Sequence, residues 1–147
     1  MSLLASLAPA ESALLAEARR AVLATLRPDG RPRLVPITFA ADEHRDVLYS
    51  PLDEKRKTVS DPRRLARVRD ILARPSVTLL VDRWSEDWTT LIWLRLDGRA
   101  TLLEPGEEHG GAVGQLRRRY PQYANHRIES QPLLRFTVEA VRGWAAR

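Results

Sequence analysis

The sequence RAVLATLRPDGRPRLVPITFA, residues 20–40, contains two apolar, β-rich runs on either side of a tight-turn signal. The first run covers residues 21–26 and the second covers residues 34–40, with a Pro-Asp-Gly tripeptide at 28–30 between them. Two such runs joined by this kind of turn predict a β-hairpin. Pro36 lies inside the second run and cannot donate a ladder hydrogen bond. We therefore expect this strand to bulge or to face outward at Pro36, which leaves backbone groups free for another partner.

Further β-rich runs follow this hairpin, at residues 46–50, 77–81 and 133–141. Residues 89–104 alternate apolar and polar positions around an Asp-Gly pair, which suits either one long bent strand or a second hairpin. Helices do not alternate with these strands, so a parallel βαβ arrangement is disfavoured. The sequence therefore predicts a mainly β fold, an antiparallel barrel with peripheral α-helices.

Three segments are predicted to be helical: residues 9–19, 60–74 and 107–120. The second has Pro62 at or near its first helical position, and apolar residues recur at helical spacing until an Arg-Pro pair ends it. The third contains three glycines, each of which costs a helix about 1 kcal/mol relative to alanine. In the second helix we expect the Leu65 side to be buried and the charged side chains to face outward; these are Arg63, Arg67, Asp70 and Arg74.

The length of 147 residues suits one domain with a hydrophobic core, and we expect residues 1–147 to form that single domain. Hydrophobic residues make up 44% of the chain and charged residues 29%, a balance typical of soluble globular proteins. No stretch approaches the ~18 to 20 uncharged residues of a membrane-spanning helix, so no membrane association is expected. The first residues lack the basic and apolar regions of a signal peptide, so we expect a cytoplasmic protein.

Several kinds of chemistry are absent from the sequence. The chain has no cysteine, which removes disulfides, thiolate nucleophiles and cysteine-bound metals. The histidines at positions 44, 109 and 126 lie far apart and show no metal-binding spacing, so no metal site is predicted. The G-x-S-x-G nucleophile motif and the glycine motifs of dinucleotide and P-loop sites are also missing. The sequence therefore offers no candidate catalytic residue.

Basic residues are concentrated in one part of the chain. Residues 53–74 contain eight basic and four acidic residues, a local net charge of +4, whereas residues 82–108 contain seven acidic and three basic residues, a local net charge of −4. This polarity presents a surface that attracts anions. Proteins that bind single-stranded nucleic acid interleave aromatic residues with basic ones. All four tryptophans lie outside residues 53–74, so no nucleic-acid partner is expected.

The basic segment also holds the chain's only two lysines, Lys55 and Lys57, among 24 basic residues. With Arg56 they follow a strand that ends in the hydroxyl of Ser50, and they precede a helix start. A hydroxyl, mobile cations and the N–H groups of a helix N-terminus are the groups that bind phosphate. A solvated charged loop has the same composition, so the local chemistry leaves both interpretations open.

The tryptophans are expected to have different roles. Trp93 lies in an alternating apolar run and is expected in the core or at a dimer contact. Trp84 and Trp88 lie in a polar, acidic loop and are expected to be exposed. There they could line a pocket for a planar ligand.

The order of these features resembles the FMN-binding split β-barrel superfamily, and within it the deazaflavin-dependent oxidoreductases of the pyridoxamine-phosphate-oxidase-like class. The segments that carry the resemblance cover nearly the whole chain: VLATLRPDGRPRLVPITFA, VLYSPLDEKRKT, RLARVRDILARPSVTLLVDRW, DWTTLIWLRLDGRATLLE, RRRYPQYANH and RGWAA.

The resemblance implies a six-stranded antiparallel split β-barrel that works as a homodimer, with two cofactor sites at the subunit interface. It places backbone groups of Val35, Pro36 and Ile37 along the edge of an isoalloxazine-like ring. It further implies a phosphate site and closure of the cofactor site by the partner chain. By this resemblance, the phosphate is held by Ser50, Lys55 and Lys57. A longer anionic tail is contacted by Arg56 or Arg64. The partner chain closes the site with Trp88 or Trp93.

The resemblance further implies an oxidoreductase that transfers hydride from the reduced deazaflavin coenzyme F-420 to a small organic substrate. Cofactor position and ring electronics supply most of the catalysis in such a reaction, which agrees with the lack of a catalytic triad. Two alternatives stay open. One is the same fold with FMN, acting as a pyridoxamine-phosphate-oxidase-like enzyme or a flavin reductase, and the other is a non-catalytic cofactor-binding or carrier protein.

Overall fold

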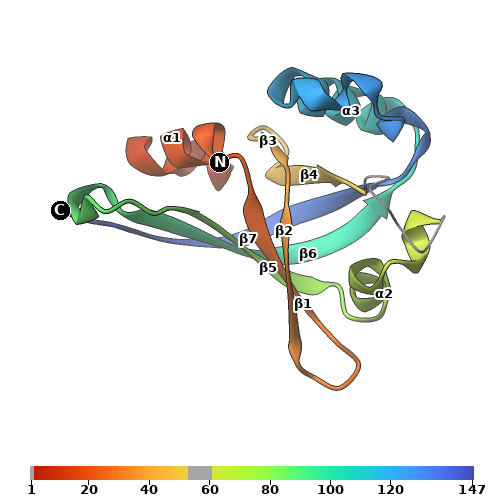
Figure 1. Ribbon diagram of the computed structural model, residues 1–147, viewed down its shortest axis with the longest axis horizontal. Helices are drawn as coiled ribbons and strands as arrows, with labels where there is room; N and C mark the ends of the chain where they lie inside the picture. Colours follow the sequence, from red (N-terminus) through yellow and green to blue (C-terminus); the bar gives the residue numbers. More distant parts are fainter. Residues whose placement is uncertain (1, 53–60) are drawn as a thin grey trace.

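The computed structural model describes residues 2–52 and 61–147, and within them seven strands form one antiparallel sheet (Figure 1). The order of the strands across the sheet is β2-β1-β5-β6-β7-β4-β3. The strands are β1 (Ala21–Leu26), β2 (Pro32–Ile37), β3 (Ala40–Asp42), β4 (Val47–Pro51), β5 (Ser76–Arg83), β6 (Ile92–Leu103) and β7 (Leu133–Ala145).

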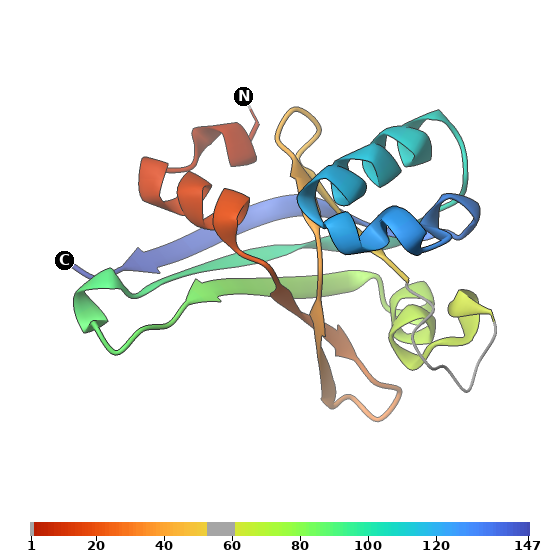
Figure 2. The same cartoon turned by 45° about the horizontal axis from the view of Figure 1, so that its top comes forward.

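Three α-helices cover parts of this sheet in the described part of the chain. Helix α1 (Pro9–Glu17) contacts β5 and β6, α2 (Ala66–Ala73) contacts β1, and α3 (Glu107–Arg119) contacts β3 and β4. Figure 2 shows α1 and α3 above the long strands, with α2 below them at the end where α3 lies. Short 3-10 helices complete the structure: η1 (Leu4–Ser6), η2 (Pro62–Arg64), η3 (Trp88–Thr90), η4 (Pro121–Asn125) and η5 (Ile128–Ser130). None of the described helices has the length and apolar character needed to cross a bilayer.

The predicted hairpin is confirmed. β1 and β2 pair in antiparallel register without a shift, and Gly30 adopts a positive φ of 83° in the turn between them. The Gly30 amide donates to the carbonyl of Arg27 at 2.9 Å, and the Arg27 amide donates to the carbonyl of Arg31 at 2.9 Å. Glycine adopts this backbone conformation without the steric cost that a Cβ would add.

The expected count of six strands is wrong, because the run at residues 34–40 is divided between two strands. The chain leaves β2 after Ile37 and enters β3 at Ala40, on the opposite edge of the sheet. At the break, the Phe39 side chain is completely buried, and the Phe39 amide donates to the Tyr120 hydroxyl at 3.2 Å. A contact with a distant tyrosine therefore replaces the strand hydrogen bond at this point.

This connection also explains the shape of the sheet. Two residues span at most about 11 Å between the last Cα of β2 and the first Cα of β3. The edges of a flat seven-stranded sheet would lie roughly 29 Å apart. The sheet must therefore roll until its edges approach each other, although among the described residues no strand pairing joins β2 to β3. The fold is a rolled but open antiparallel sheet, which agrees with the mainly β prediction.

Residues 92–103 form one long strand. Of the two alternatives for residues 89–104, the long bent strand is therefore confirmed and the second hairpin is not. The strand is β6, and its pairing with β7 shifts between Asp97 and Gly98. Opposite this shift, Asp97 pairs with Ala140 and Gly98 pairs with Val138, so Glu139 is the extra residue of a β-bulge. The bulge bends the two longest strands of the sheet.

The hydrophobic core has two parts. The larger one fills the rolled sheet and includes Leu23, Phe39, Leu94, Leu96 and Phe136. The smaller one lies between α3 and the β3–β4–β7 end of the sheet, and it contains Ala40, Val47, Tyr49, Ala112, Val113, Leu116, Tyr120, Tyr123, Ile128 and Leu133.

A hydrogen bond of Tyr49 links β4 to α3 within the smaller core. Its hydroxyl donates to Oε1 of Glu108 at 3.1 Å, and the same carboxylate accepts from Nε of Arg135 at 3.1 Å and from Arg45 at 3.0 Å. Burial of the phenol, together with the adjacent Glu108 carboxylate, raises the pKa of Tyr49 to about 12. Because Ser50 follows Tyr49 in β4, this network also fixes the backbone position of Ser50.

Candidate functional site

A pocket of about 480 Å³ lies where the two edges of the rolled sheet approach each other. It is formed by the end of β2, the end of β4, the start of α2 and the η4 turn. We call it the edge pocket, and its lining residues are Arg20, Val35, Pro36, Ile37, Thr38, Ser50, Pro51, Leu65, Arg67 and Tyr123.

The first wall of the edge pocket is the edge strand β2. Within residues 2–52 and 61–147, β2 pairs only with β1, so no neighbouring strand from these residues uses the backbone groups on its other side. Pro36 is tolerated here because an edge strand does not need its missing N–H. The β1–β2 pairing passes through Pro36 opposite Val22 without a bulge. Of the two expectations for Pro36, the outward-facing strand is confirmed and the bulge is not.

Ser50 forms part of the second wall. It lies on β4, a strand in which every residue is buried, and it pairs with Leu134 of β7. Its own side chain is only 3% exposed although it lines the edge pocket. A buried hydroxyl beside a cavity is a strong hydrogen-bonding group for a ligand, because water does not compete freely for it.

The start of α2 supplies the third wall through Arg67 and through Leu65, the residue that precedes the helix, and a buried carboxylate holds the helix in place. Asp70 is 2% exposed and accepts from Oγ1 of Thr25 at 2.8 Å and from Nε of Arg33 at 2.7 Å. Burial alone would raise the pKa of Asp70, but these two hydrogen bonds and the positive charge of Arg33 outweigh burial and lower it below its usual value. The expectation that Asp70 faces outward is therefore wrong. Helical spacing cannot reveal a partner on a strand nearly forty residues away.

The fourth wall is η4, which follows α3. The hydroxyl of Tyr123 is hydrogen-bonded to Oγ1 of Thr38 at 2.7 Å, and Tyr123 itself is 6% exposed. Next to it, the Tyr120 hydroxyl donates to the carbonyl of Arg19 at 3.1 Å. Arg119 donates to the carbonyls of Leu15, Ala16 and Ala18 at the end of α1. The RRRYPQY segment thus joins α1 to the β2–β3 connection.

The charge of the edge pocket suits an anion. Its described lining residues include two arginines, Arg20 and Arg67, and no carboxylate. No group of metal-ligating side chains occurs among the described residues, so the pocket carries no sign of a metal centre. Its volume lies within the range of about 300–1,000 Å³ that is usual for small-molecule and cofactor sites. A buried hydroxyl, two guanidinium groups and an open strand edge fit a planar cofactor that carries a phosphate.

The edge pocket brings together four of the residues singled out in the sequence. Val35, Pro36, Ile37 and Ser50 all line it, although the first three lie on the edge strand β2 and Ser50 lies on β4, next to the opposite edge strand β3. Lys55, Arg56 and Lys57 lie outside the described residues. Arg64 is exposed in η2 and does not line the pocket.

Trp88 also lies elsewhere, at the start of η3 between β5 and β6, and it is 67% exposed. The sequence analysis did not assign the other six lining residues to a site: Arg20, Thr38, Pro51, Leu65, Arg67 and Tyr123. Tyr123 belongs to the RRRYPQYANH segment that carried the family resemblance, which was the only signal for it.

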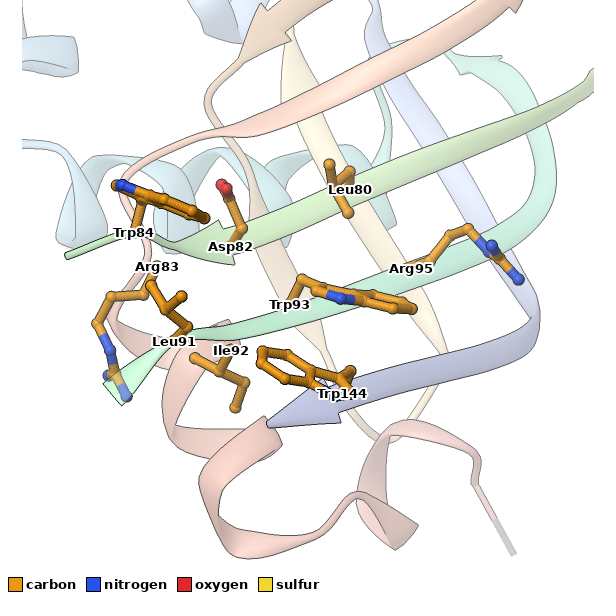
Figure 3. A pocket seen from close by; sticks show the side chains of 9 residues that line it. All are labelled: Leu80, Asp82, Arg83, Trp84, Leu91, Ile92, Trp93, Arg95 and Trp144. Carbon is orange, nitrogen blue, oxygen red and sulfur yellow. The ribbon is translucent and has the colours of Figure 1, made fainter. Parts of the chain in front are cut away.

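A second pocket of about 370 Å³ lies on the outer face of β5, β6 and β7 (Figure 3). Trp93 of β6 and Trp144 of β7 are directly paired across the strands, and Figure 3 shows Leu80 near Trp93 and Trp84 farther away, just beyond the end of β5. Trp84 is 70% exposed and Trp144 is 48% exposed. We call this the tryptophan pocket; its remaining lining residues are Asp82, Arg83, Leu91, Ile92 and Arg95.

The expected exposure of Trp84 and Trp88 is confirmed. Trp93 is half-buried on the outer face and is not among the buried core residues.

Solved structures similar to this fold include the following three. The heme storage protein HutZ from Vibrio cholerae is 14% identical, with 93% of this chain and 92% of that chain covered and a TM-score of 0.68. A FAD-binding protein from Mesorhizobium loti is 22% identical, with 93% and 94% covered and a TM-score of 0.67. An F420 reductase is 22% identical, with 89% and 94% covered and a TM-score of 0.65. At these identities the likeness establishes the fold alone.

A search of the curated proteins gave no match. Residues 7–145 match the family model described as pyridoxamine 5'-phosphate oxidase. This match covers nearly the whole chain, and it agrees with the rolled antiparallel sheet and with the resemblance found in the sequence. The chain therefore belongs to the pyridoxamine 5'-phosphate oxidase family of the FMN-binding split-barrel superfamily.

Proposed function

We propose that this chain is a cytoplasmic, homodimeric oxidoreductase that binds a flavin-type cofactor in the edge pocket and uses the deazaflavin coenzyme F-420. The observation that carries the proposal is the convergence of Val35, Pro36, Ile37 and Ser50 on one pocket with two arginines and no carboxylate among its described lining residues. When bound and reduced, the cofactor supplies a hydride to an electron-poor organic substrate.

The residues of the edge pocket have separate roles in this proposal. The edge of β2 at Val35–Ile37 offers backbone hydrogen-bonding groups to the polar side of the ring. Ser50 and Arg67 hold the phosphate together with Lys55 and Lys57 of the basic segment. Arg56 or Arg64 contacts a longer anionic tail.

The local charge favours the deazaflavin over FMN. Coenzyme F-420 carries a phosphodiester and an oligoglutamate tail, which together form a longer anion than the single phosphate of FMN. The net charge of +4 over residues 53–74 attracts such an anion more strongly. FMN is the alternative cofactor, and the family description and the similar FAD-binding protein both support a flavin in this fold.

A non-catalytic carrier is the second candidate function. The likeness to a heme storage protein supports it, because that protein has the same fold and a storage role. The residues of the edge pocket do not separate the two candidates, since a carrier also needs a phosphate site and a ring site.

Titration of the purified protein with coenzyme F-420 and with FMN tests the proposed function. Both cofactors fluoresce, so binding is measured directly, and we expect saturable binding of both with the tighter binding for coenzyme F-420. Turnover of the reduced cofactor then distinguishes an enzyme from a carrier. If neither cofactor binds, the proposal is wrong.

The proposed homodimer uses the outer face of the sheet. Residues paired directly across strands point to the same face, and Pro36, Val22, Leu80 and Arg95 form one such row over β2, β1, β5 and β6. Pro36 of the edge pocket therefore lies on the same face as the tryptophan pocket, about 10 Å from Leu80 across two strand spacings. A second copy seated on this face would cover the outer side of the edge pocket.

This interface predicts that charge on the outer face separates the subunits. Replacing Trp144 by glutamate places a charge beside Trp93, and we expect the dimer to become a monomer in analytical ultracentrifugation, because a buried unpaired charge is costly. Leu72→Glu is the matched control, since Leu72 is 62% exposed on α2, away from this face. A wild-type protein that sediments as a monomer, or a Leu72 variant that dissociates equally, would contradict this interface.

A further inference from the structure

A separate pocket of about 560 Å³ lies between α2 and the β1–β2 hairpin. We call it the α2–hairpin pocket, and its lining residues are Pro28, Arg33, Ala66, Arg69, Asp70, Leu72, Ala73 and Arg74. None of these residues lines the edge pocket. Arg67 of the edge pocket and Arg69 of this pocket are two positions apart on α2, so their side chains point to nearly opposite sides of the helix. The two cavities therefore lie on different sides of α2.

Two of the three arginines in this pocket are oriented by other groups of the protein. Nε of Arg33 donates to Oδ2 of the buried Asp70 at 2.7 Å. Nε of Arg74 donates to the carbonyl of Leu26 at 3.0 Å, and its Nη2 lies 3.8 Å from Oδ1 of Asp70. Within residues 2–52 and 61–147, both Nη groups of Arg33 and Nη1 of Arg74 make no hydrogen bond. These guanidinium groups can therefore bind an anion with little further loss of side-chain freedom.

The charge of the α2–hairpin pocket matches a dianion. Arg69 is exposed on α2 and adds a third guanidinium group. Asp70 is the one carboxylate among the described lining residues, so the net charge of the lining is +2. A phosphate monoester carries a charge of about −1.5 to −2 at neutral pH, and its three oxygens accept charge-assisted hydrogen bonds from arginine. A single carboxylate would neutralise only part of this charge.

The rest of the lining is apolar. It consists of Pro28, Ala66, Leu72 and Ala73, and Leu72 is 62% exposed. Apolar side chains offer no hydrogen bond to a free phosphate ion, but contact with the carbon atoms of a ligand removes them from water. The volume of the pocket is also within the range that is usual for organic ligands. The lining therefore suits a phosphate group joined to an organic part.

We propose that the α2–hairpin pocket binds a small organic phosphate monoester. The phosphate lies between the guanidinium groups of Arg33, Arg69 and Arg74, and the organic part lies against Leu72. This site is separate from the edge pocket and does not depend on the proposed function. Because the ligand contacts both α2 and the hairpin, it binds the folded chain and stabilises it against unfolding.

An NMR titration of the ¹⁵N-labelled protein with phenyl phosphate at neutral pH tests the proposal. The backbone amides of Leu72 and Ala73 report on the α2–hairpin pocket, and those of Ile37 and Ser50 report on the edge pocket, so binding at each site is measured separately. Phenyl sulfate is the matched ligand, since it has the same shape but a single negative charge. We expect saturable shifts at Leu72 and Ala73 with phenyl phosphate, and binding at least about tenfold weaker with phenyl sulfate.

Two variants locate the phosphate. Arg69→Ala should weaken binding at the Leu72 and Ala73 amides about tenfold or more, the loss of a charge-assisted hydrogen bond. Arg31→Ala is the matched control, because Arg31 is an exposed arginine of the same hairpin that does not line the pocket, and it should change the affinity less than about threefold. Arg69 is an exposed helix residue, so its replacement is expected to leave the fold intact.

Three results would each overturn the proposal: no saturable shift at Leu72 and Ala73, equal affinities of the Arg69 and Arg31 variants, or equal affinities for phenyl phosphate and phenyl sulfate. Displacement of phenyl phosphate from these amides by coenzyme F-420 would also overturn it, because the pocket would then be part of the cofactor site.

Discussion

Replacing Asp70 by alanine is expected to lower the free energy of unfolding by about 2–4 kcal/mol, which is the range for loss of a buried, charge-assisted network. The carboxylate is 2% exposed and joins α2 to two strands, since it accepts hydrogen bonds from Thr25 of β1 and from Arg33 of β2. It also forms an ion pair at 3.8 Å with Arg74, the residue that follows α2. Its removal leaves the Thr25 hydroxyl, 1% exposed, without this partner. Urea unfolding at neutral pH measures the change.

The same carboxylate predicts a loss of stability in acid. The folded state lowers the pKa of Asp70, so the stabilisation is fully present above the ordinary value of 3.8 and is lost as the pH falls through the lowered folded value. The stability difference between wild type and Asp70→Asn should therefore shrink below about pH 4. Glu17→Ala is the control, because Glu17 is an exposed carboxylate 3.9 Å from Arg83, and such pairs contribute little. Equal effects of Asp70 and Glu17 replacement would contradict this account of α2.

Replacing Gly98 by alanine is expected to destabilise the fold by about 3 kcal/mol or more, since overpacking against the backbone is among the most costly changes. A Cβ at Gly98 would lie 1.9 Å from the carbonyl oxygen and 2.9 Å from the carbonyl carbon of Thr137. Both are backbone atoms of the neighbouring strand, so β6 and β7 would have to separate at the bulge. Thermal unfolding followed by circular dichroism measures the loss.

Gly110→Ala is the matched control for this prediction and should have the opposite sign. Gly110 lies inside α3, and a Cβ there would meet nothing within 4 Å. Alanine is better than glycine in a helix by about 0.8–1 kcal/mol, so this variant should be more stable than the wild type. If Gly98→Ala unfolds at the temperature of the wild type, the close approach at the bulge is not present in solution.

Local signals in the sequence predicted the local structure well. The Pro-Asp-Gly turn predicted a hairpin, and the structure has it with β1 at residues 21–26 as expected. Residues 107–119 form a helix despite three glycines, because one face of the helix is buried against β3 and β4. Packing of an apolar face thus outweighs the low helix propensity of glycine.

Interactions between distant parts of the chain were not predictable in the same way. The break between β2 and β3 depends on a hydrogen bond from Phe39 to Tyr120, and the burial of Asp70 depends on Arg33. In both cases the two partners lie in distant parts of the chain, so the repeat of apolar residues along one helix or strand cannot reveal the contact. For the same reason local chemistry and the family resemblance suggested Ser50, and the resemblance suggested Val35–Ile37, but nothing in the sequence indicated that Arg20 and Arg67 join them in one pocket.

The central claim is that the edge pocket holds the anionic part of a ring-shaped cofactor, and Arg67 tests it most directly. Arg67 and Arg69 lie two positions apart on α2, but Arg67 lines the edge pocket and Arg69 does not. The measurement is a fluorescence titration of coenzyme F-420 against Arg67→Ala, Arg69→Ala and wild type. We expect Arg67→Ala to weaken binding about tenfold or more, the loss of a charge-assisted hydrogen bond, and Arg69→Ala to change it less than about threefold. Equal affinities of the Arg67 and Arg69 variants would contradict the claim.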